Sequence, residues 1–256
     1  MTDTPIEAKS HFYAHGERLL REEIERSEPP FTRRVVIGDC ALYEADCLEL
    51  MSHLGEFDAV VTDPPYGIGE SGGRFRDRKG GGHRVLKRKY WDKARPDGKI
   101  FSLILEMSSS QIIWGGNYFA DLLPPSMGWL YWQKLMGGDF SDGELAWTSR
   151  NSALREFTLC NKGAGKQHPT QKPLALMQWC LGFLPDATTI LDPFMGSGTT
   201  GVACVKLGRT FTGIELDSDY FDIACQRIEE AYRQPDMFIE PPAPKPEQLD
   251  MLEGEQ

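Results

Sequence analysis

The sequence predicts an α/β fold with a mostly parallel, twisted sheet. From residue 173 onward, helical and β-rich runs alternate along the chain, at 173–184, 188–192, 199–208, 210–215 and 219–233. Such alternation is typical of βαβ units, in which each helix returns the chain to the next parallel strand. With 256 residues, 40% of them hydrophobic, the chain is long enough for one large globular domain, or for one domain with a small attachment.

The first part of the chain predicts further elements of both kinds. Helical runs are expected at 17–26, which Pro29 and Pro30 close, and at 47–54, 99–107 and 117–123. β-rich runs lie at 41–45, 57–63, 111–115, 128–134, 144–149 and 155–161. In the run GWLYWQK, alternation predicts a strand that buries either Trp129 and Tyr131, or Trp132. We therefore expect a helical extension at 1–34, an α/β domain at 35–233 and a disordered, acidic, proline-rich tail at 234–256.

Composition indicates a protein of a reducing compartment. No apolar run reaches the roughly 18 to 20 residues needed to span a bilayer, and the N-terminus lacks the apolar core of a signal peptide. The six cysteines are scattered without a CxxC pair, at 40, 47, 160, 180, 204 and 225. Neither a disulfide framework nor a metal site is therefore expected, and the cytoplasm is the expected location.

Charge is unevenly distributed along the chain. Residues 74–95 contain ten Lys or Arg and two Asp, a local net charge of +8. Because the whole chain has a net charge of −10, the remaining residues together carry a net charge of −18. This basic loop, which we bound at 67–98, is either a solvated insertion or a surface for a polyanion.

An acid, two prolines and a tyrosine follow the apolar run FDAVV. In TDPPYG (62–67) the prolines fix the backbone φ angle and donate no hydrogen bond, so the segment predicts a stiff, exposed platform rather than packing material. Asp63 could also be a simple turn cap and Tyr66 a rim aromatic.

A glycine-rich turn in TTILDPFMGSGTTG (188–201) separates a predicted strand from a predicted helix. Gly196 and Gly198 let a ligand approach the backbone at a helix N-terminus, although they could merely close a tight turn. Glu215 ends the next strand, nineteen residues after Gly196, where an acid can reach ribose hydroxyls. No lysine follows the second glycine, which excludes a GxxxxGK[ST] nucleotide triphosphatase. The turn therefore predicts a nucleoside cofactor.

DPPY (63–66), HPTQKP (168–173) and DPFMGSGT (192–199), in this order, resemble the motifs of amino-methylating DNA methyltransferases. These enzymes transfer a methyl group from S-adenosylmethionine to adenine N6 or cytosine N4. The order of the motifs resembles the β group, whose Rossmann-like catalytic domain is circularly permuted. The resemblance covers residues 35–233 and implies a methyltransferase that acts on double-stranded DNA in the cytoplasm, at the nucleoid. It leaves open whether a restriction endonuclease accompanies the enzyme.

The resemblance also implies roles for the tetrad. Asp63 and the Pro64 carbonyl would accept hydrogen bonds from the target amine, and Pro65 would keep the segment rigid. Tyr66 would stack on a base flipped out of the duplex. The two acceptors would localise the amine lone pair toward the methyl group, with no covalent intermediate.

The same resemblance implies a set of cofactor-binding residues. The wall around the cofactor would be formed by Asp192, Phe194, Gly196, Ser197 and Gly198. Glu215 would bind the ribose, and Asp46 the adenine unless it is only a cap. Thr170 and Lys172 would hold the carboxylate end.

DNA contacts are expected from the basic loop. Its candidate residues are Arg74, Arg76, Arg78, Lys79, Arg84, Lys87, Arg88, Lys89, Tyr90 and Trp91. The two aromatic residues would stack or wedge at the flipped base, or else anchor the loop. The segment 136–166 is a second, short candidate for target recognition. A homodimer is a further expectation, and Gln248–Leu252 (QLDML) resembles peptides that dock on the replication sliding clamp.

An Asp rather than a Ser at the start of the tetrad favours adenine over cytosine. The alternatives are N4-cytosine methylation by the same residues, methylation of RNA or of a protein glutamine amide, and a DNA-binding regulator without catalysis.

Overall fold

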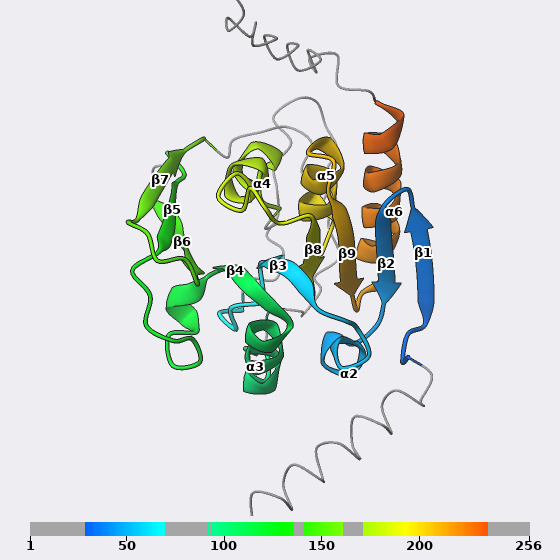
Figure 1. Ribbon diagram of the computed structural model, residues 1–256, viewed down its shortest axis with the longest axis horizontal. Coiled ribbons are helices and arrows are strands. Elements are labelled where there is room, and N and C mark those ends of the chain that lie inside the picture. The colour runs from blue at the N-terminus through cyan, green and yellow to red at the C-terminus, as the bar shows by residue number, and fades with distance from the viewer. Residues whose placement is uncertain (1–28, 70–91, 93, 136–140, 161–170, 235–256) are drawn as a thin grey trace, which may run out of the picture.

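The computed structural model describes residues 29–69, 92, 94–135, 141–160 and 171–234, which form one nine-stranded sheet with helices on both faces (Figure 1). The strands are β1 (Arg33–Ile37), β2 (Cys40–Glu44), β3 (Phe57–Thr62), β4 (Ser108–Trp114), β5 (Trp129–Gln133), β6 (Gly143–Thr148), β7 (Arg155–Thr158), β8 (Thr189–Asp192) and β9 (Thr210–Glu215). The helices are α2 (Cys47–Met51), α3 (Gly98–Met107), α4 (Leu174–Leu181), α5 (Thr199–Lys206), α6 (Ser218–Arg233) and the 3₁₀ turn η1 (Gly116–Tyr118).

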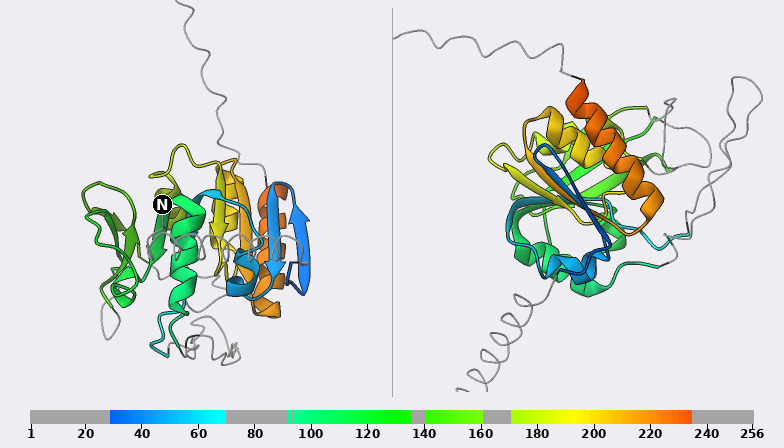
Figure 2. Two further views of the ribbon diagram at one scale, coloured as in Figure 1. Left: turned by 60° about the horizontal axis from the view of Figure 1, so that its bottom comes forward. Right: turned by 90° about the vertical axis from the view of Figure 1, so that its right-hand side faces the viewer.

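Two apolar layers enclose the sheet. One contains buried residues of α4, α5 and α6, such as Leu176, Ala203 and Phe221. The other contains buried residues of α2 and α3, such as Leu50 and Phe101. The turned views show these helices on opposite sides of the strands (Figure 2). The core is thus a three-layer α/β arrangement, as the alternation of elements predicts.

The strand order in space is β1-β2-β9-β8-β3-β4-β6-β5-β7. Of the eight pairings among the described strands, five are parallel, and β2, β9, β8, β3 and β4 form a continuous parallel array. The carboxyl ends of these five strands therefore share one edge of the sheet, where ligands bind in open α/β folds. The loops that carry the tetrad, the glycine turn, Glu215 and Asp46 all leave from this edge.

The predicted helix at 117–123 is wrong. Only Gly116–Tyr118 forms a helical turn, after Gly115 at φ 69°. The aromatic rings of this segment pack on neighbouring side chains: Phe119 is fully buried, with its ring centroid 4.7 Å from that of Phe101. Tertiary packing and the following prolines thus prevail over a local helical pattern of seven residues.

The first strand is missing from the sequence prediction. β1 pairs with β2 through a two-residue turn, Gly38-Asp39, in which Gly38 has φ 54°. A glycine–aspartate pair between β-rich runs is a hairpin signal that could have identified the strand. Because β1 begins at Arg33, the sheet starts two residues before the expected boundary at 35.

The strand β5 decides between the two phases expected for GWLYWQK. Leu130 and Trp132 are 2% and 1% exposed, whereas Trp129 and Tyr131 are half-buried. The phase that buries Trp132 is therefore the correct one.

All six cysteines lie in the described part of the chain and are free thiols. None of the described helices combines the length and the apolar character that a membrane crossing requires. Several expected features lie outside the described residues: the helix at 17–26, the candidate DNA-contacting residues within 74–91, Thr170, residues 136–140 and 161–166 of the candidate recognition segment, and the tail with Gln248–Leu252.

Candidate active site

The tetrad and the glycine turn meet because β3 and β8 are neighbours. The Thr62 hydroxyl, at the end of β3, donates a 2.7 Å hydrogen bond to Oδ1 of Asp192, at the end of β8. Both side chains are buried. This bond ties together two strand ends that are 130 residues apart in sequence.

A cavity of about 350 Å³ lies at this edge of the sheet. The expected site residues that line it are Asp46, Asp63, Pro64, Pro65, Tyr66, Lys172, Asp192, Phe194, Gly196, Ser197 and Glu215. Cavities of this size are typical of small-molecule sites. Among the described candidates, Gly198 does not line the cavity; it is the N-cap of α5 and has φ 75°.

Glu215 holds the glycine turn from the neighbouring strand. Its Oε2 accepts a 2.9 Å hydrogen bond from the Gly196 N–H, and its Oε1 accepts a 2.8 Å bond from the Asp217 N–H. Burial raises the pKa of Glu215 to about 7, although these backbone bonds oppose the shift. A carboxylate offers about four lone-pair positions, so Glu215 can still accept from hydroxyl groups in the cavity.

The Asp192 carboxylate holds the start of the glycine turn in place through hydrogen bonds. Its oxygens accept from Thr62, from the Thr200 hydroxyl at 2.7 Å and from the Phe194 N–H at 3.1 Å. Burial raises its pKa to about 6 against these hydrogen bonds. Three protein donors already engage this carboxylate, so the structure gives Asp192 a role in shaping the turn.

Arg227, on α6, is a residue of the site that the sequence analysis missed. Its guanidinium donates to the Ser197 hydroxyl at 2.9 Å and to the Thr199 hydroxyl at 3.1 Å. It also donates to the Ser197 carbonyl. Arg227 thereby clamps the turn where α5 begins, and no local pattern in α6 signals this contact.

Asp46 is the N-cap of α2 and lies two residues after the end of β2. Its Oδ1 accepts a 2.8 Å hydrogen bond from the Leu48 N–H, so the cap that we weighed against a ligand role is present. The same residue lines the cavity, which leaves its adenine-binding role a prediction.

The Asp63 carboxylate faces two side-chain donors. Oδ1 accepts from the Tyr66 hydroxyl at 2.7 Å, and Oδ2 accepts from the Lys172 ammonium at 2.5 Å. Burial raises the pKa of Asp63, and the positive charge of Lys172 opposes that rise. Burial also raises the pKa of Tyr66 well above its usual value, so its hydroxyl remains a donor.

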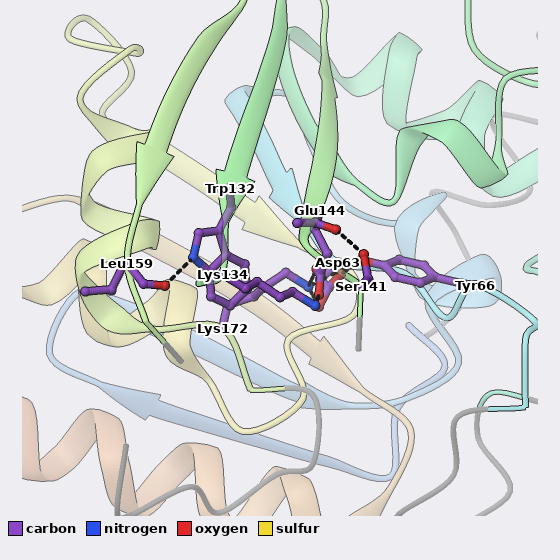
Figure 3. Close-up of polar contacts among 9 residues, drawn as sticks. Asp63, Tyr66, Trp132, Lys134, Ser141, Glu144, Leu159 and Lys172 are labelled. Atoms are coloured by element: carbon purple, nitrogen blue, oxygen red, sulfur yellow. Dashed lines mark hydrogen bonds and ion pairs between the residues drawn. The ribbon is translucent and has the colours of Figure 1, made fainter. Parts of the chain in front are cut away.

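Glu144 and Lys134, on β6 and after β5, extend this group of charges (Figure 3). The Lys172 ammonium lies 2.9 Å from Glu144 Oε2, and Lys134 forms an ion pair with Glu144 Oε1. Burial opposes ionisation of Glu144, but the two lysines prevail and lower its pKa. The sequence resemblance implies that Lys172 holds the carboxylate end of the cofactor, whereas the structure places its ammonium against Asp63 of the tetrad.

The Tyr66 ring is enclosed by the segment after β4. It stacks on Tyr118 with ring centroids 4.8 Å apart and planes 15° apart. A Cβ at Gly115 would lie 2.1 Å from Tyr66 Cε1, so only glycine fits there. The sequence analysis missed both neighbours: it placed Gly115 at the end of a strand and Tyr118 in an ordinary helix.

The family comparison matches the part of the chain that carries the glycine turn and Glu215. Residues 113–226 match the N6_N4_Mtase family, described as DNA methylase. The matched segment includes Glu144, HPTQKP, the glycine turn and Glu215 but begins after the tetrad.

Curated relatives of the chain include type II methyltransferases. The chain is 32% identical over 152 residues to Type II methyltransferase M2.DpnII of Streptococcus pneumoniae, over 58% of this chain and 52% of that protein. It is 27% identical over 248 residues to M2.MboI of Moraxella bovis, over 74% of this chain and 87% of the relative. The chain thus spans about half the length of the first of these relatives. The matches support an amino-methyltransferase.

Two solved structures share the fold. The M1.HpyAVI–SAM complex aligns with a TM-score of 0.52 and 24% identity, over 74% of this chain and 98% of that one. The PvuII DNA methyltransferase (cytosine-N4-specific) aligns with a TM-score of 0.53 and 16% identity, over 79% and 95% of the two chains. The chain therefore has the α/β sheet fold of these DNA methyltransferases.

Proposed function

We propose that this protein is a site-specific DNA methyltransferase that transfers a methyl group from S-adenosylmethionine to the N6 amine of a flipped adenine in duplex DNA. The observation that carries the proposal is the cavity that joins the tetrad to the glycine turn and Glu215. The family match and the type II relatives support the same reaction class.

The residues of the cavity fit a nucleoside cofactor. Around the ideal Cβ position of Gly196 there is no atom within 4 Å, so the backbone at this turn borders open space. The Glu215 carboxylate retains lone pairs for ribose hydroxyls, and the half-buried Phe194 offers an apolar surface. Lys172 is engaged with Asp63 and Glu144, so the contact with the cofactor carboxylate that the resemblance implies for it is not part of this proposal.

The glycine turn and Glu215 would hold S-adenosylmethionine, which would supply an electrophilic methyl group on a positively charged sulfur; the sulfur would keep the electron pair of its bond to the methyl group, and the proton displaced from the amine would pass to water. Asp63 and the Pro64 carbonyl accept from the amine N–H groups and direct its lone pair toward the methyl carbon. Tyr66 offers a ring face to the flipped base.

We also propose that the catalytic domain is circularly permuted relative to the usual methyltransferase order. The spatial array β2, β9, β8, β3, β4 is continuous, yet β8 and β9 come last in the chain. The duplex contacts of the basic loop, the homodimer and the sliding-clamp peptide are proposed from the sequence alone, because no contact among the described residues bears on them.

N4-cytosine methylation is the second candidate, because one structure with this fold is a cytosine-N4-specific enzyme. The Asp that opens the tetrad favours adenine.

Mass spectrometry of nucleosides tests the proposal. Unmethylated duplex DNA is incubated with the full chain and S-adenosylmethionine, then digested. N6-methyladenosine is the expected product. N4-methylcytidine would keep the chemistry and overturn the base. No methylated nucleoside, from protein that binds the cofactor in calorimetry, would redirect the proposal to RNA, protein amides or a silent DNA binder.

We predict that Asp63→Ala abolishes transfer, by at least about 1,000-fold, while the cofactor Kd changes little. The reason is that Asp63 contacts the amine, whereas the glycine turn is held by Glu215 and Asp192. Asp186→Ala, which removes an exposed carboxylate before the opposite end of β8, is the matched control. Equal loss of transfer and cofactor binding would contradict the assigned role.

A further inference from the structure

Lys172 lies between two carboxylates that come from distant parts of the chain. Its ammonium is 2.5 Å from Asp63 Oδ2 and 2.9 Å from Glu144 Oε2, and its side chain is only 6% exposed. Lys134 pairs with the other oxygen of Glu144. The four side chains form a compact group with two positive and two negative charges (Figure 3).

We propose that Lys172 and Glu144 are positioning residues for the methyl transfer: Lys172 aims the Asp63 carboxylate and keeps it a hydrogen-bond acceptor, and Glu144 holds Lys172 in place. This inference rests on the proposed function, and it assigns roles to two residues that belong to neither the tetrad nor the glycine turn.

The first argument is electrostatic. Burial favours the protonated form of Asp63, and the negative charge of Glu144 acts in the same direction. A protonated Asp63 would present a hydroxyl and lose part of its capacity to accept from the amine. Among the described residues, Lys172 is the cation in direct contact with Asp63, and its ammonium favours the carboxylate form.

The second argument is geometric. In the structure, Tyr66 and Lys172 each occupy one oxygen of Asp63. Both donors also reach Glu144 Oε2, Lys172 at 2.9 Å and Tyr66 at 3.4 Å. Glu144 can therefore take a larger share of both donors when Asp63 turns toward an amine. This alternative acceptor avoids leaving a buried ammonium without a partner.

The surrounding titratable groups define what a pH measurement would report. Tyr66, Lys172 and Glu144 contact one another around Asp63; Lys134 lies behind Glu144, and Cys180 of α4 lies near Lys172. Asp192 lies at the end of the neighbouring strand. Other carboxylates that line the cavity are Asp46, Asp92 and Glu215. Of these groups, Lys172 pairs directly with Asp63, and both Lys172 and Lys134 pair with Glu144.

Three substitutions separate the roles. Lys172→Met removes the charge at similar length, Lys172→Arg keeps it, and Glu144→Gln removes the negative charge that opposes Lys172. We expect Lys172→Met to lower kcat at pH 7.5 about 100-fold and to move the acid limb of the pH–kcat profile to higher pH. Lys172→Arg should stay within about tenfold of the wild type, a loss smaller than that from a missing general acid or base.

Glu144→Gln should move the acid limb in the opposite direction, to lower pH, because it removes a negative charge from the surroundings of Asp63. It should also lower kcat at neutral pH, since Lys172 then has one anchor fewer. In all three variants the cofactor Kd, measured by calorimetry, should change by less than about threefold, well under one tenfold step in affinity.

A direct titration of Asp63 keeps the inference testable without DNA. The side-chain carboxyl ¹³C signal of Asp63, assigned by its loss in Asp63→Asn, should titrate at higher pH in Lys172→Met and at lower pH in Glu144→Gln. If the wild type methylates no DNA but these shifts occur, the proposed function fails and the electrostatic coupling stands. Unchanged titration in both variants, or a Lys172→Met loss entirely in cofactor Kd, would overturn the inference and return Lys172 to the cofactor.

Discussion

Gly198 begins α5 in a backbone conformation that favours glycine, with φ 75°. A Cβ at this position would lie 2.9 Å from the Ala224 Cβ and 3.1 Å from its Cα, on α6. The close approach of α5 and α6 therefore depends on a missing side chain. The same turn carries Gly196, whose Cβ position borders open space at the cavity.

We predict that Gly198→Ala destabilises the fold more than Gly208→Ala. Both positions have positive φ, but the Cβ of Gly208 would meet nothing within 4 Å. The left-handed backbone alone costs roughly 1–2 kcal/mol in an L-residue, and overpacking adds about 1–3 kcal/mol. Urea unfolding should show the smaller loss in Gly208→Ala and the sum in Gly198→Ala. Equal losses of unfolding free energy in the two variants would show that α6 moves away from the added methyl group at no measurable cost.

At the scale of elements, β3 and β8 are joined at both ends. Asp58, near the start of β3, accepts from the Thr188 N–H at 2.7 Å and from the Thr189 N–H at 2.8 Å, next to the start of β8. Thr62 and Asp192 join the other ends. The register of this strand pair, and with it the placement of the tetrad beside the glycine turn, is therefore fixed by side chains as well as by the ladder.

The Asp58 bonds predict a pH dependence of stability. The Thr188 hydroxyl and the backbone donors lower the pKa of Asp58 from 3.8 to about 2. A lowered pKa means that the stabilisation is complete above pH 3.8 and is lost as the pH falls through about 2. Asp58→Asn should therefore have a lower Tm than the wild type at pH 7, with a difference that shrinks below pH 4.

Thermal melts of Asp58→Asn and of the exposed Asp186→Asn between pH 7 and pH 2 measure this effect. Asp186→Asn should follow the wild type throughout. A Tm difference for Asp58→Asn that does not depend on pH would show that hydrogen-bond geometry, and not charge, joins the two strands.

At the scale of the whole molecule, the basic segment leaves the fold beside the cavity. The Gly69 N–H donates to the Asp92 carbonyl at 2.9 Å, and the Gly67 N–H donates to Asp92 Oδ1 at 2.7 Å. These described residues flank the segment 70–91, and Asp92 lines the cavity. In a chain with net charge −10, the described residues that flank the most basic segment thus lie next to the proposed base pocket.

We predict that replacing Arg84, Lys87 and Arg88 by Gln weakens DNA binding and reduces its salt dependence. Each phosphate contact contributes a slope of about −0.9 to log K against log salt, so the loss of three contacts should reduce the slope by up to about 3. Replacing Lys99, Lys206 and Arg233, which lie on α3, α5 and α6, is the matched control. An unchanged slope in the first variant would place the DNA elsewhere.

The features that depend on local chemistry can be predicted from the sequence. The α/β alternation, Asp63 after β3, the glycine turn after β8 and Glu215 at the end of β9 are all readable there. Each rests on a residue type with a special backbone or on a polar group that ends an apolar strand. The structure places these residues around one cavity, as the shared edge of parallel strands requires.

The charges that surround Asp63 are visible only once the chain is folded. Glu144 and Lys134 read in sequence as ordinary polar positions of surface strands, and Lys172 as one member of a motif. Their contacts arise because β6 lies beside β4, and because the chain before α4 returns to the end of β3. Strand order is set by packing of the whole core, so no local pattern records that these side chains meet.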